Sequence, residues 1–344
     1  MENQSRPNLF SYATSELSQD AFICWLAAWA DPKFKDSELY QIASKFLISL
    51  IQKHKKDYTL ENIQTVKVRR QVEKLDILIE VNKESFNNKL AILIEDKTHT
   101  DHHSGQLERY YGNTIKNYTS DQIVPIYFKT GYQSKFDVGK YKTFLRKEFL
   151  ELLKDESITI KNAIFCDFLS HLENMELVVN QFITKKLEDG NAVSVWNDND
   201  WRGFFMHLYN NRSSLYDTSI NDEANWDYIA NPSGGFFGFW WYFMSIQYDT
   251  YTPYLQLENQ KLCFKIKVED ATKRAQAREE TYYKLKGVYP NLIRPKRMGN
   301  GLYMTVARWN SDYRGMREDG TLDFEATLQN LRKAQQILDT AFPK

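Results

Sequence analysis

Apolar side chains near the N-terminus recur at the 3.6-residue period of an α-helix. One such run begins after a capping serine, Ser15 or Ser18, and ends at Asp31-Pro32, and a second covers about residues 37–54. Three shorter apolar runs follow, each of strand length, at residues 63–70, 75–81 and 90–97. The polar stretch 82–88 joins the last two of these runs, so they are predicted to form a β-hairpin.

The hairpin is followed by a short polar loop, a helical run at residues 105–118 and a buried strand at 122–128. This gives the order αβββαβ. Residues 141–188 are predicted to be helical, from the amphipathic run TFLRKEFLELLK onward. These helices are expected to pack on the sheet.

A polar stretch, EDGNAVSVWNDND, separates this part from one of different character. Beyond it, apolar runs predict antiparallel strands, interrupted by a basic helix at about 271–286 and followed by a terminal helix. The fold class is therefore α/β to α+β. We predict two domains, an N-terminal αβββαβ mixed-sheet core at 1–188 and a C-terminal α+β domain of antiparallel strands and helices at 189–344.

Composition supports a folded chain with more than one core. The 344 residues are 42% hydrophobic and 26% charged, which is typical of globular proteins, and the length exceeds what one core usually fills. No apolar stretch is long enough for a membrane span, and the N-terminus has no signal-peptide core, so we expect a cytoplasmic protein. Three scattered cysteines argue against a disulfide framework or a thiolate metal site.

The 45 basic and 45 acidic residues balance, but they are unevenly placed. Residues 261–297 hold eleven basic and four acidic side chains, a net charge of +7. This segment, with Lys273, Arg274 and Arg278 in its helix, is either a contact for a phosphate backbone or a solvated helix face.

Candidate chemistry lies on the hairpin, where carboxylates interrupt apolar strands. If the hairpin is symmetric about its turn, the residue numbers of opposing residues add up to roughly 170. Asp76 then stands nearly opposite Glu95, on one face of the sheet. Like charges in that position repel unless a cation lies between them, and Mg²⁺ prefers oxygen ligands, to which the backbone carbonyl of Asp96 can add one. Lys97 shares the face of Glu95. Two carboxylates and a lysine are the groups that metal-assisted phosphodiester hydrolysis needs.

This pattern, Asp76 followed by Glu95-Asp96-Lys97 across a hairpin, resembles the PD-(D/E)XK nuclease superfamily. That superfamily has an αβββαβ, restriction-endonuclease-like core, and some members carry a Gln-x-x-x-Tyr element, matched here by Gln106 and Tyr110. Leu75 stands where the motif's name has proline, which members often lack. The resemblance covers the first half to two-thirds of the chain.

The resemblance implies roles for these residues. Asp76 and Glu95 would bind Mg²⁺ or Mn²⁺, with Glu16 on the leading helix as a further ligand. Lys97 would position the water or stabilise the transition state. Gln106 would orient the water or a nucleotide, with Tyr110 as a nucleic-acid contact. The product would be cleaved DNA, in prokaryotic defence or genome maintenance.

Each of these residues also has a simpler interpretation. Glu16 fits a first-turn acid favoured by the helix dipole, Gln106 and Tyr110 fit a solvated helix face, and Lys97 fits a surface ion pair with Asp96.

Two further features have competing explanations. A cluster in the predicted loop could suggest a zinc site, but it fits solvated side chains or phosphate contacts better. Its members are His99, Asp101, His102 and His103. The aromatic stretch 234–244 fits a strand core better than a base-stacking platform.

We therefore expect an Mg²⁺-dependent nuclease whose C-terminal domain recognises substrate or a partner, which includes a second copy of the chain. One alternative is a non-catalytic nucleic-acid or protein binding module on the same fold. Another is a metal-dependent hydrolase of RNA or nucleotides. A third is that the hairpin is out of register, which would place Asp76 and Glu95 on opposite faces.

Overall fold

The computed structural model describes residues 7–98, 105–155, 157, 159–188, 194–219, 222–232, 234–244 and 251–343. It divides into two compact units, Met1–Glu176 and Leu177–Lys344, called here the first and second units. The division follows Glu176, earlier in the chain than the predicted boundary after residue 188. Across the described part of the chain, every helix is too short or too polar to span a membrane.

The first unit contains a five-stranded sheet. Its strands, in spatial order, are β1 (Val66–Val72), β2 (Leu75–Val81), β3 (Leu90–Lys97), β4 (Ile123–Lys129) and β5 (Lys142–Leu145). The pairs β1–β2 and β2–β3 are antiparallel, whereas β3–β4 and β4–β5 are parallel. The predicted mixed sheet is confirmed.

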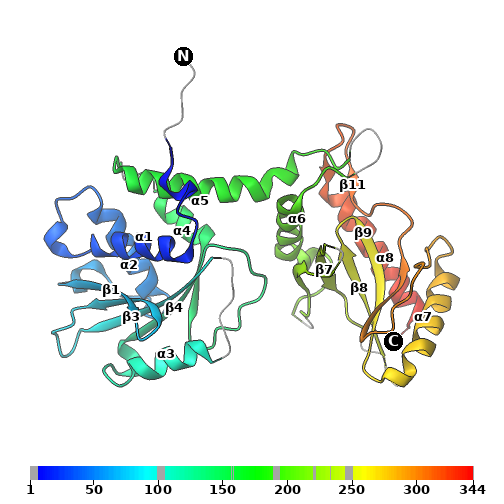
Figure 1. Ribbon diagram of the computed structural model, residues 1–344, viewed down its shortest axis with the longest axis horizontal. Coiled ribbons are helices and arrows are strands. Elements are labelled where there is room, and N and C mark those ends of the chain that lie inside the picture. Colours follow the sequence, from blue (N-terminus) through cyan, green and yellow to red (C-terminus); the bar gives the residue numbers. More distant parts are fainter. Residues whose placement is uncertain are drawn as a thin grey trace, which may run out of the picture. The chain divides into compact units, whose positions relative to one another are not determined.

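Helices cover both faces of this sheet (Figure 1). Those that share a core with one face are α1 (Glu16–Ala28), α2 (Tyr40–Gln52), α4 (Arg146–Leu153) and α5 (Ala163–Asn180). The other face packs against α3 (Gln106–Thr114). Strand alternation explains the two cores, because Ile77 and Ile94 join the first one while Leu78 and Leu93 join the second.

The β2–β3 hairpin has the register on which the candidate chemistry depends. Ile77 pairs with Ile94 and Leu78 with Leu93, so the same register continued by one residue places Asp76 opposite Glu95. Both residues then lie on the α3 face, together with Leu78 and Leu93. The out-of-register alternative is wrong.

One predicted helical stretch is a strand instead. Lys142–Leu145 forms β5 and pairs in parallel with β4, and helix α4 begins only at Arg146. Phe144 is buried and stacks on Phe128 of β4. Pairing also supplies partners for the backbone groups at the edge of β4, and this long-range gain outweighs the local helical pattern.

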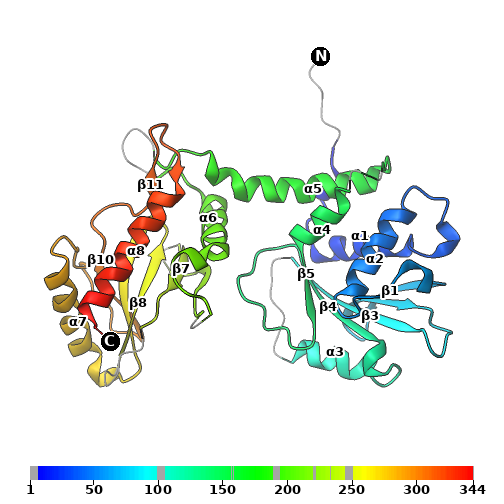
Figure 2. The ribbon, with the colours of Figure 1, turned by 180° about the vertical axis from the view of Figure 1, so that it is seen from behind.

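The second unit is built on an antiparallel sheet. Its spatial order is β10 (Tyr303–Arg308), β9 (Lys261–Val268), β8 (Tyr251–Glu258), β7 (Phe236–Trp241) and β6 (Asn225–Ile229). Figure 2 shows the helices of this unit, which are α6 (Asp198–Asn210), α7 (Arg274–Val288) and α8 (Phe324–Ala341). A two-stranded ladder pairs β11 (Gly315–Met316) with β12 (Leu322–Asp323). The predicted α+β unit of antiparallel strands is confirmed.

The aromatic stretch 234–244 contributes to the core of this unit. Phe237, Phe239 and Trp241 are buried at alternating positions of β7, and the ring of Phe239 stacks on Phe205 of α6. These three rings are therefore core residues, as the strand spacing favours.

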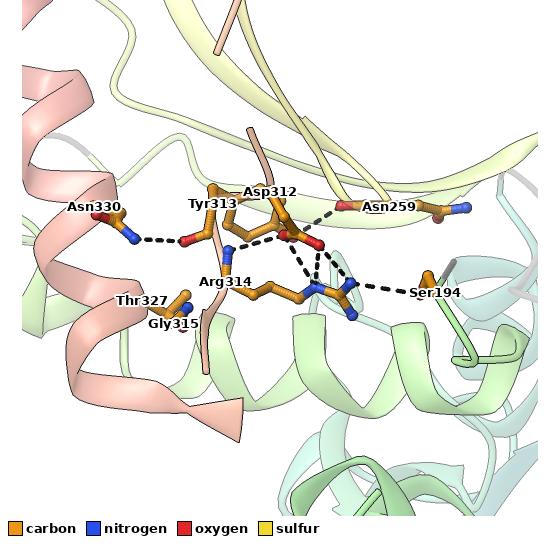
Figure 3. Close-up of polar contacts among 8 residues, drawn as sticks. All are labelled: Ser194, Asn259, Asp312, Tyr313, Arg314, Gly315, Thr327 and Asn330. Carbon is orange, nitrogen blue, oxygen red and sulfur yellow. Dashed lines mark hydrogen bonds and ion pairs between the residues drawn. The ribbon is translucent and has the colours of Figure 1, made fainter. Parts of the chain in front are cut away.

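A buried arginine anchors the segment that leads into β11 (Figure 3). The side chain of Arg314 is 1% exposed and donates to both carboxylate oxygens of Asp312. Its guanidinium also lies 4.4 Å from the ring centroid of Trp196 and 4.6 Å from that of Trp201. A charge this deeply buried is stable only when it is paired in this way.

Candidate functional site

Three charged side chains meet at one end of the hairpin, on the α3 face. Asp76 is the second residue of β2, and Glu95 and Lys97 stand near the end of β3. The Lys97 Nζ atom lies 2.8 Å from Glu95 Oε1 and 3.7 Å from Asp76 Oδ2. The two carboxylate oxygens are thus no more than about 6.5 Å apart, within the limit of about 8 Å beyond which one cation with bonds near 2.1 Å could not join them.

Burial makes this group of charges electrostatically unusual. Glu95 is fully buried, and burial together with the charge of Asp76 raises the pKa of Glu95 to about 7. Burial also raises the pKa of Asp76, against the opposing effect of Lys97. Burial disfavours the ammonium form of Lys97, but the hydrogen bond to Glu95 and the nearby carboxylates outweigh it and raise the Lys97 pKa. Lys97 therefore stays charged, while the two carboxylates compete for it.

Helix α3 adds polar contacts to the same face. Gln106 Nε2 donates to Glu95 Oε1 at 2.7 Å and lies 3.0 Å from the hydroxyl of Tyr110. Tyr110 is buried, so its face of the helix is not a solvated one. At spacing i, i+4, the amide and the phenol act on the carboxylate as one unit.

Glu16 reaches the site from the start of α1. Its Oε1 accepts a hydrogen bond from the backbone N–H of Thr98 at 3.0 Å, which ties the helix to the chain just after Lys97. Its charge also acts on Asp76 and helps to raise the pKa of that carboxyl. Glu16 is therefore close to the group, although it is also the first-turn acid that the helix dipole favours.

The side chain of Asp96 points to the opposite face from its two neighbours. It accepts from Gln19 Nε2 on α1 and is 1% exposed. The suggested surface ion pair between Lys97 and Asp96 is therefore wrong, because strand alternation separates the two side chains. The backbone N–H of Asp96 donates to Asp76 Oδ2 at 2.9 Å, which fixes Asp76 against β3.

A family model supplies the decisive comparison. The model of the PD-(D/E)XK nuclease superfamily matches residues 7–195, which is more than half of the chain and includes the residues of the site described so far in this section. The chain belongs to this superfamily. A nuclease-type hydrolase function and a nucleic-acid substrate follow from that membership. No curated protein and no solved structure matches the chain.

Sequence reasoning missed three residues at this PD-(D/E)XK site. Asp20 is 2% exposed, and burial together with the charge of Asp76 raises its pKa to about 6. Gln19 holds Asp96, and Lys129 of β4, 1% exposed, pairs in register with Lys97. One signal was available, since Asp20 follows Glu16 at the i, i+4 spacing of a single helical face.

The donor set fits a hard divalent cation that keeps several of its waters. Glu95 Oε2 is buried without a hydrogen-bond partner, which is costly for a carboxylate unless a cation satisfies it. Within the described ranges, no cluster of three or more His, Cys, Asp or Glu side chains is arranged to hold a metal. Two carboxylates therefore lie ready to share a cation, and backbone oxygen, water and, after a movement of its side chain, Glu16 would complete the ligand set.

The remaining candidates lie elsewhere. Lys273 is exposed in the second unit. Arg274 Nε donates to the carbonyl of Val268 at 3.1 Å, and Arg278 Nη1 donates to that of Gly299 at 3.0 Å. Both guanidinium groups are therefore hydrogen-bonded to backbone carbonyls of their own unit. The loop cluster lies outside the described residues; its members are His99, Asp101, His102 and His103.

Proposed function

We propose that this protein hydrolyses phosphodiester bonds in a reaction that depends on a divalent metal ion, with DNA as the preferred substrate. Mg²⁺ or Mn²⁺ would be held by the carboxylates of Asp76 and Glu95, the backbone carbonyl of Asp96 and, as a further ligand, Glu16. The observation that carries the proposal is the buried Glu95 Oε2, which has no hydrogen-bond partner and faces a second carboxylate across the hairpin.

Each residue of the site would have a separate role beside the cation. A bound divalent cation neutralises charge on the scissile phosphate and favours ionisation of a water molecule. Lys97, kept protonated by Glu95 and Asp76, stabilises the negative charge that grows on the phosphate oxygens. Gln106 holds the Glu95 carboxylate in place, and Tyr110 limits the rotation of that amide.

The second unit would serve recognition of the substrate or of a partner, including a second copy of the chain. Its basic segment 261–297, with Lys273 exposed, supports a contact with a phosphate backbone. A role in prokaryotic defence or DNA maintenance is consistent with a nuclease that carries a separate recognition unit.

The test is cleavage of plasmid, linear duplex and single-stranded DNA by the full chain in Mg²⁺, Mn²⁺ or EDTA. Wild type should cut only with metal, and Lys97→Ala and Asp76→Ala should each abolish cutting while leaving the circular dichroism spectrum unchanged. Lys147→Ala is the matched control, because Lys147 is an 83% exposed lysine of the same unit.

Other outcomes favour the alternatives. DNA binding that weakens with salt, with no cutting in any metal, would favour a binding module. Cutting of RNA or nucleotides in preference to DNA would change the assigned substrate but not the assigned site. Cutting that survives in Asp76→Ala would show that the reaction does not need this pair of carboxylates.

A further inference from the structure

A cavity of about 440 Å³ lies beside the candidate site in the first unit. One wall comes from strands β1 and β2, and the other comes from α3 and the residues that follow it. Tyr110 lines this cavity and also contacts Gln106, so one side chain borders both places. The polar lining residues that matter here are Arg69, Glu80, Lys83, Lys89, Asn117 and Tyr118.

The cavity lies along the strand that carries Asp76. Leu78 lines it and shares the sheet face of Asp76 two residues earlier, a distance of roughly 7 Å along a β-strand. Arg69 of β1 pairs with Leu78 in the ladder and therefore lies at the same level. The charged groups of Arg69 and Lys83 meet at Glu80, roughly 13 Å along the strand from Asp76. A chain whose phosphate sits at Asp76 would therefore reach them further along β2, beyond the adjoining nucleotide.

Charges in the cavity are arranged with the carboxylate deepest. Glu80 is 2% exposed, whereas the side chains of Arg69 and Lys83 are 40% and 39% exposed. Arg69 Nη2 lies 2.9 Å from Glu80 Oε2, and Lys83 Nζ lies 3.2 Å from Glu80 Oε1. An incoming anion would therefore meet the two cations before it met the carboxylate.

Glu80 is held as an anion and so positions both cations. Burial opposes its charge, but the hydrogen bond from Tyr118 at 2.8 Å, that from Lys83 and the charge of Arg69 outweigh burial and lower the Glu80 pKa. The lining also includes Lys89 and Glu73, so three cations stand against two carboxylates, and one positive charge remains for a phosphate. Arg69 Nε is buried and has no hydrogen-bond partner in the described structure, so the contact with Glu80 does not satisfy the whole guanidinium group.

The size and the rest of the lining fit one nucleotide. The volume is in the lower part of the range of roughly 300–1,000 Å³ that is typical of ligand sites. Leu75 and Leu78 provide apolar contact, and Asn113 and Asn117 provide amides. Lys89 adds a third cation, 5.0 Å from the ring centroid of Tyr118.

We propose that this cavity binds one nucleotide of a single-stranded nucleic acid, further along β2 from the phosphate at Asp76, with Arg69 and Lys83 contacting its phosphate group. This inference rests on the proposed function for its location. It adds that the nuclease accepts an unpaired strand in preference to an intact duplex, because base pairing would keep the nucleotide out of the cavity.

The experiment measures binding of fluorescein-labelled DNA and RNA, single-stranded and duplex, to the full chain by anisotropy in EDTA, where no cleavage occurs. Arg69→Gln and Lys83→Gln should each weaken single-strand binding by about fivefold to tenfold and lower the slope of log affinity against log salt by about 0.7. Lys147→Gln, which removes the same charge outside the cavity, should stay within about twofold of wild type.

A second variant changes the space without changing the charge. Thr114→Trp places a large ring into the cavity from the last turn of α3, and it should weaken single-strand binding as much as Arg69→Gln does. Its thermal unfolding would be measured alongside, so that only a folded protein is compared.

The outcomes separate this inference from the proposed function. Variants of the cavity that bind like wild type, a wild type that binds no single strand, or a duplex bound as tightly as a single strand would each overturn the inference. Weakened binding of the cavity variants, in a protein that cuts nothing with any metal, would support nucleotide binding in the cavity and contradict only the nuclease proposal. The DNA and RNA arms then identify which strand it accepts.

Discussion

Two buried lysines, one in each unit, stand in nearly the same local setting. Lys97 of β3 is 7% exposed and lies 2.8 Å from Glu95, and Lys265 of β9 is 9% exposed and lies 3.2 Å from Glu258. The two sites differ in the third charged group, which is negative in one and positive in the other. Lys97 also faces the carboxylate of Asp76, whereas Glu258 also has the guanidinium of Arg308 at 4.0 Å.

The difference shows how a functional site can be separated from a structural ion pair. Around Lys265 the fold supplies two positive charges for one carboxylate, and around Lys97 it supplies two carboxylates for one ammonium. A surplus of buried negative charge costs stability, which a protein tolerates where another cation is to bind. Arg314 and Asp312 form another structural pair, with one ionic partner each and aromatic rings on the arginine.

The largest expected effect compares the two lysines directly. Lys97→Met should lower the single-turnover rate of DNA cleavage by about 10²–10³-fold, because it removes a charge aimed at the transition state. Lys265→Met should leave that rate within about twofold of wild type. Equal losses in the two variants, measured under saturating protein, would mean that the loss comes from folding and not from chemistry.

Removing an acid should have opposite effects in the two units. Asp312→Asn leaves the buried guanidinium of Arg314 without its counter-ion, so we expect the second unit to lose about 2–3 kcal/mol of stability. Native-state hydrogen exchange of amides in β9 and α8 would report the loss. Unchanged protection there would show that the rings of Trp196 and Trp201 alone stabilise the charge.

Metal affinity should depend on pH through the carboxylates of the first unit. Since the pKa of Glu95 is raised to about 7, protons compete with the cation below that value. Titration calorimetry with Mn²⁺ should show affinity falling by roughly tenfold per pH unit below pH 7 and levelling off above it. An affinity that is flat between pH 5.5 and 8.5 would contradict the assignment of Glu95 as a ligand.

The smallest effect concerns stability without metal. Because the folded pKa of Asp76 lies above its ordinary value, the folded state holds more protons than the unfolded state, and stability falls as pH rises through that pKa. Asp76→Asn removes the repulsion, so in EDTA at pH 8 it should raise the melting temperature by about 2–4 °C, or roughly 1 kcal/mol.

That gain should shrink toward pH 5, where the carboxylates of the wild type are increasingly protonated. A lower melting temperature of Asp76→Asn at pH 8 would show that the bond from Lys97 outweighs the repulsion between the carboxylates.

Much of the site was predictable because it is local in the chain. The two strands and their polar turn lie within about 25 residues, and period-2 alternation assigns Asp76, Glu95 and Lys97 to one face once the turn sets the register. The bounds predicted for β2 and β3 match those of the structure.

Other features depend on segments that meet only in the folded chain. Strand β5 forms because the edge of β4 needs a partner, which the helical pattern of residues 143–154 does not reveal. The guanidinium groups of Arg274 and Arg278 look like phosphate contacts in the sequence, yet they donate to main-chain carbonyls, one at the end of β9 and one at Gly299. The cavity beside Tyr110 likewise forms between elements that are far apart in the chain.

The sequence by itself therefore determined the αβββαβ order, the hairpin and the identity of the charged group, because periodicity and a short turn are local properties. Only the tertiary structure decided that Asp96 turns away to Gln19, that Asp20 lies behind the site and that Glu95 Oε2 is left without a partner. Burial and the pKa values that follow from it are set by the helices packed on the sheet, which no local pattern specifies.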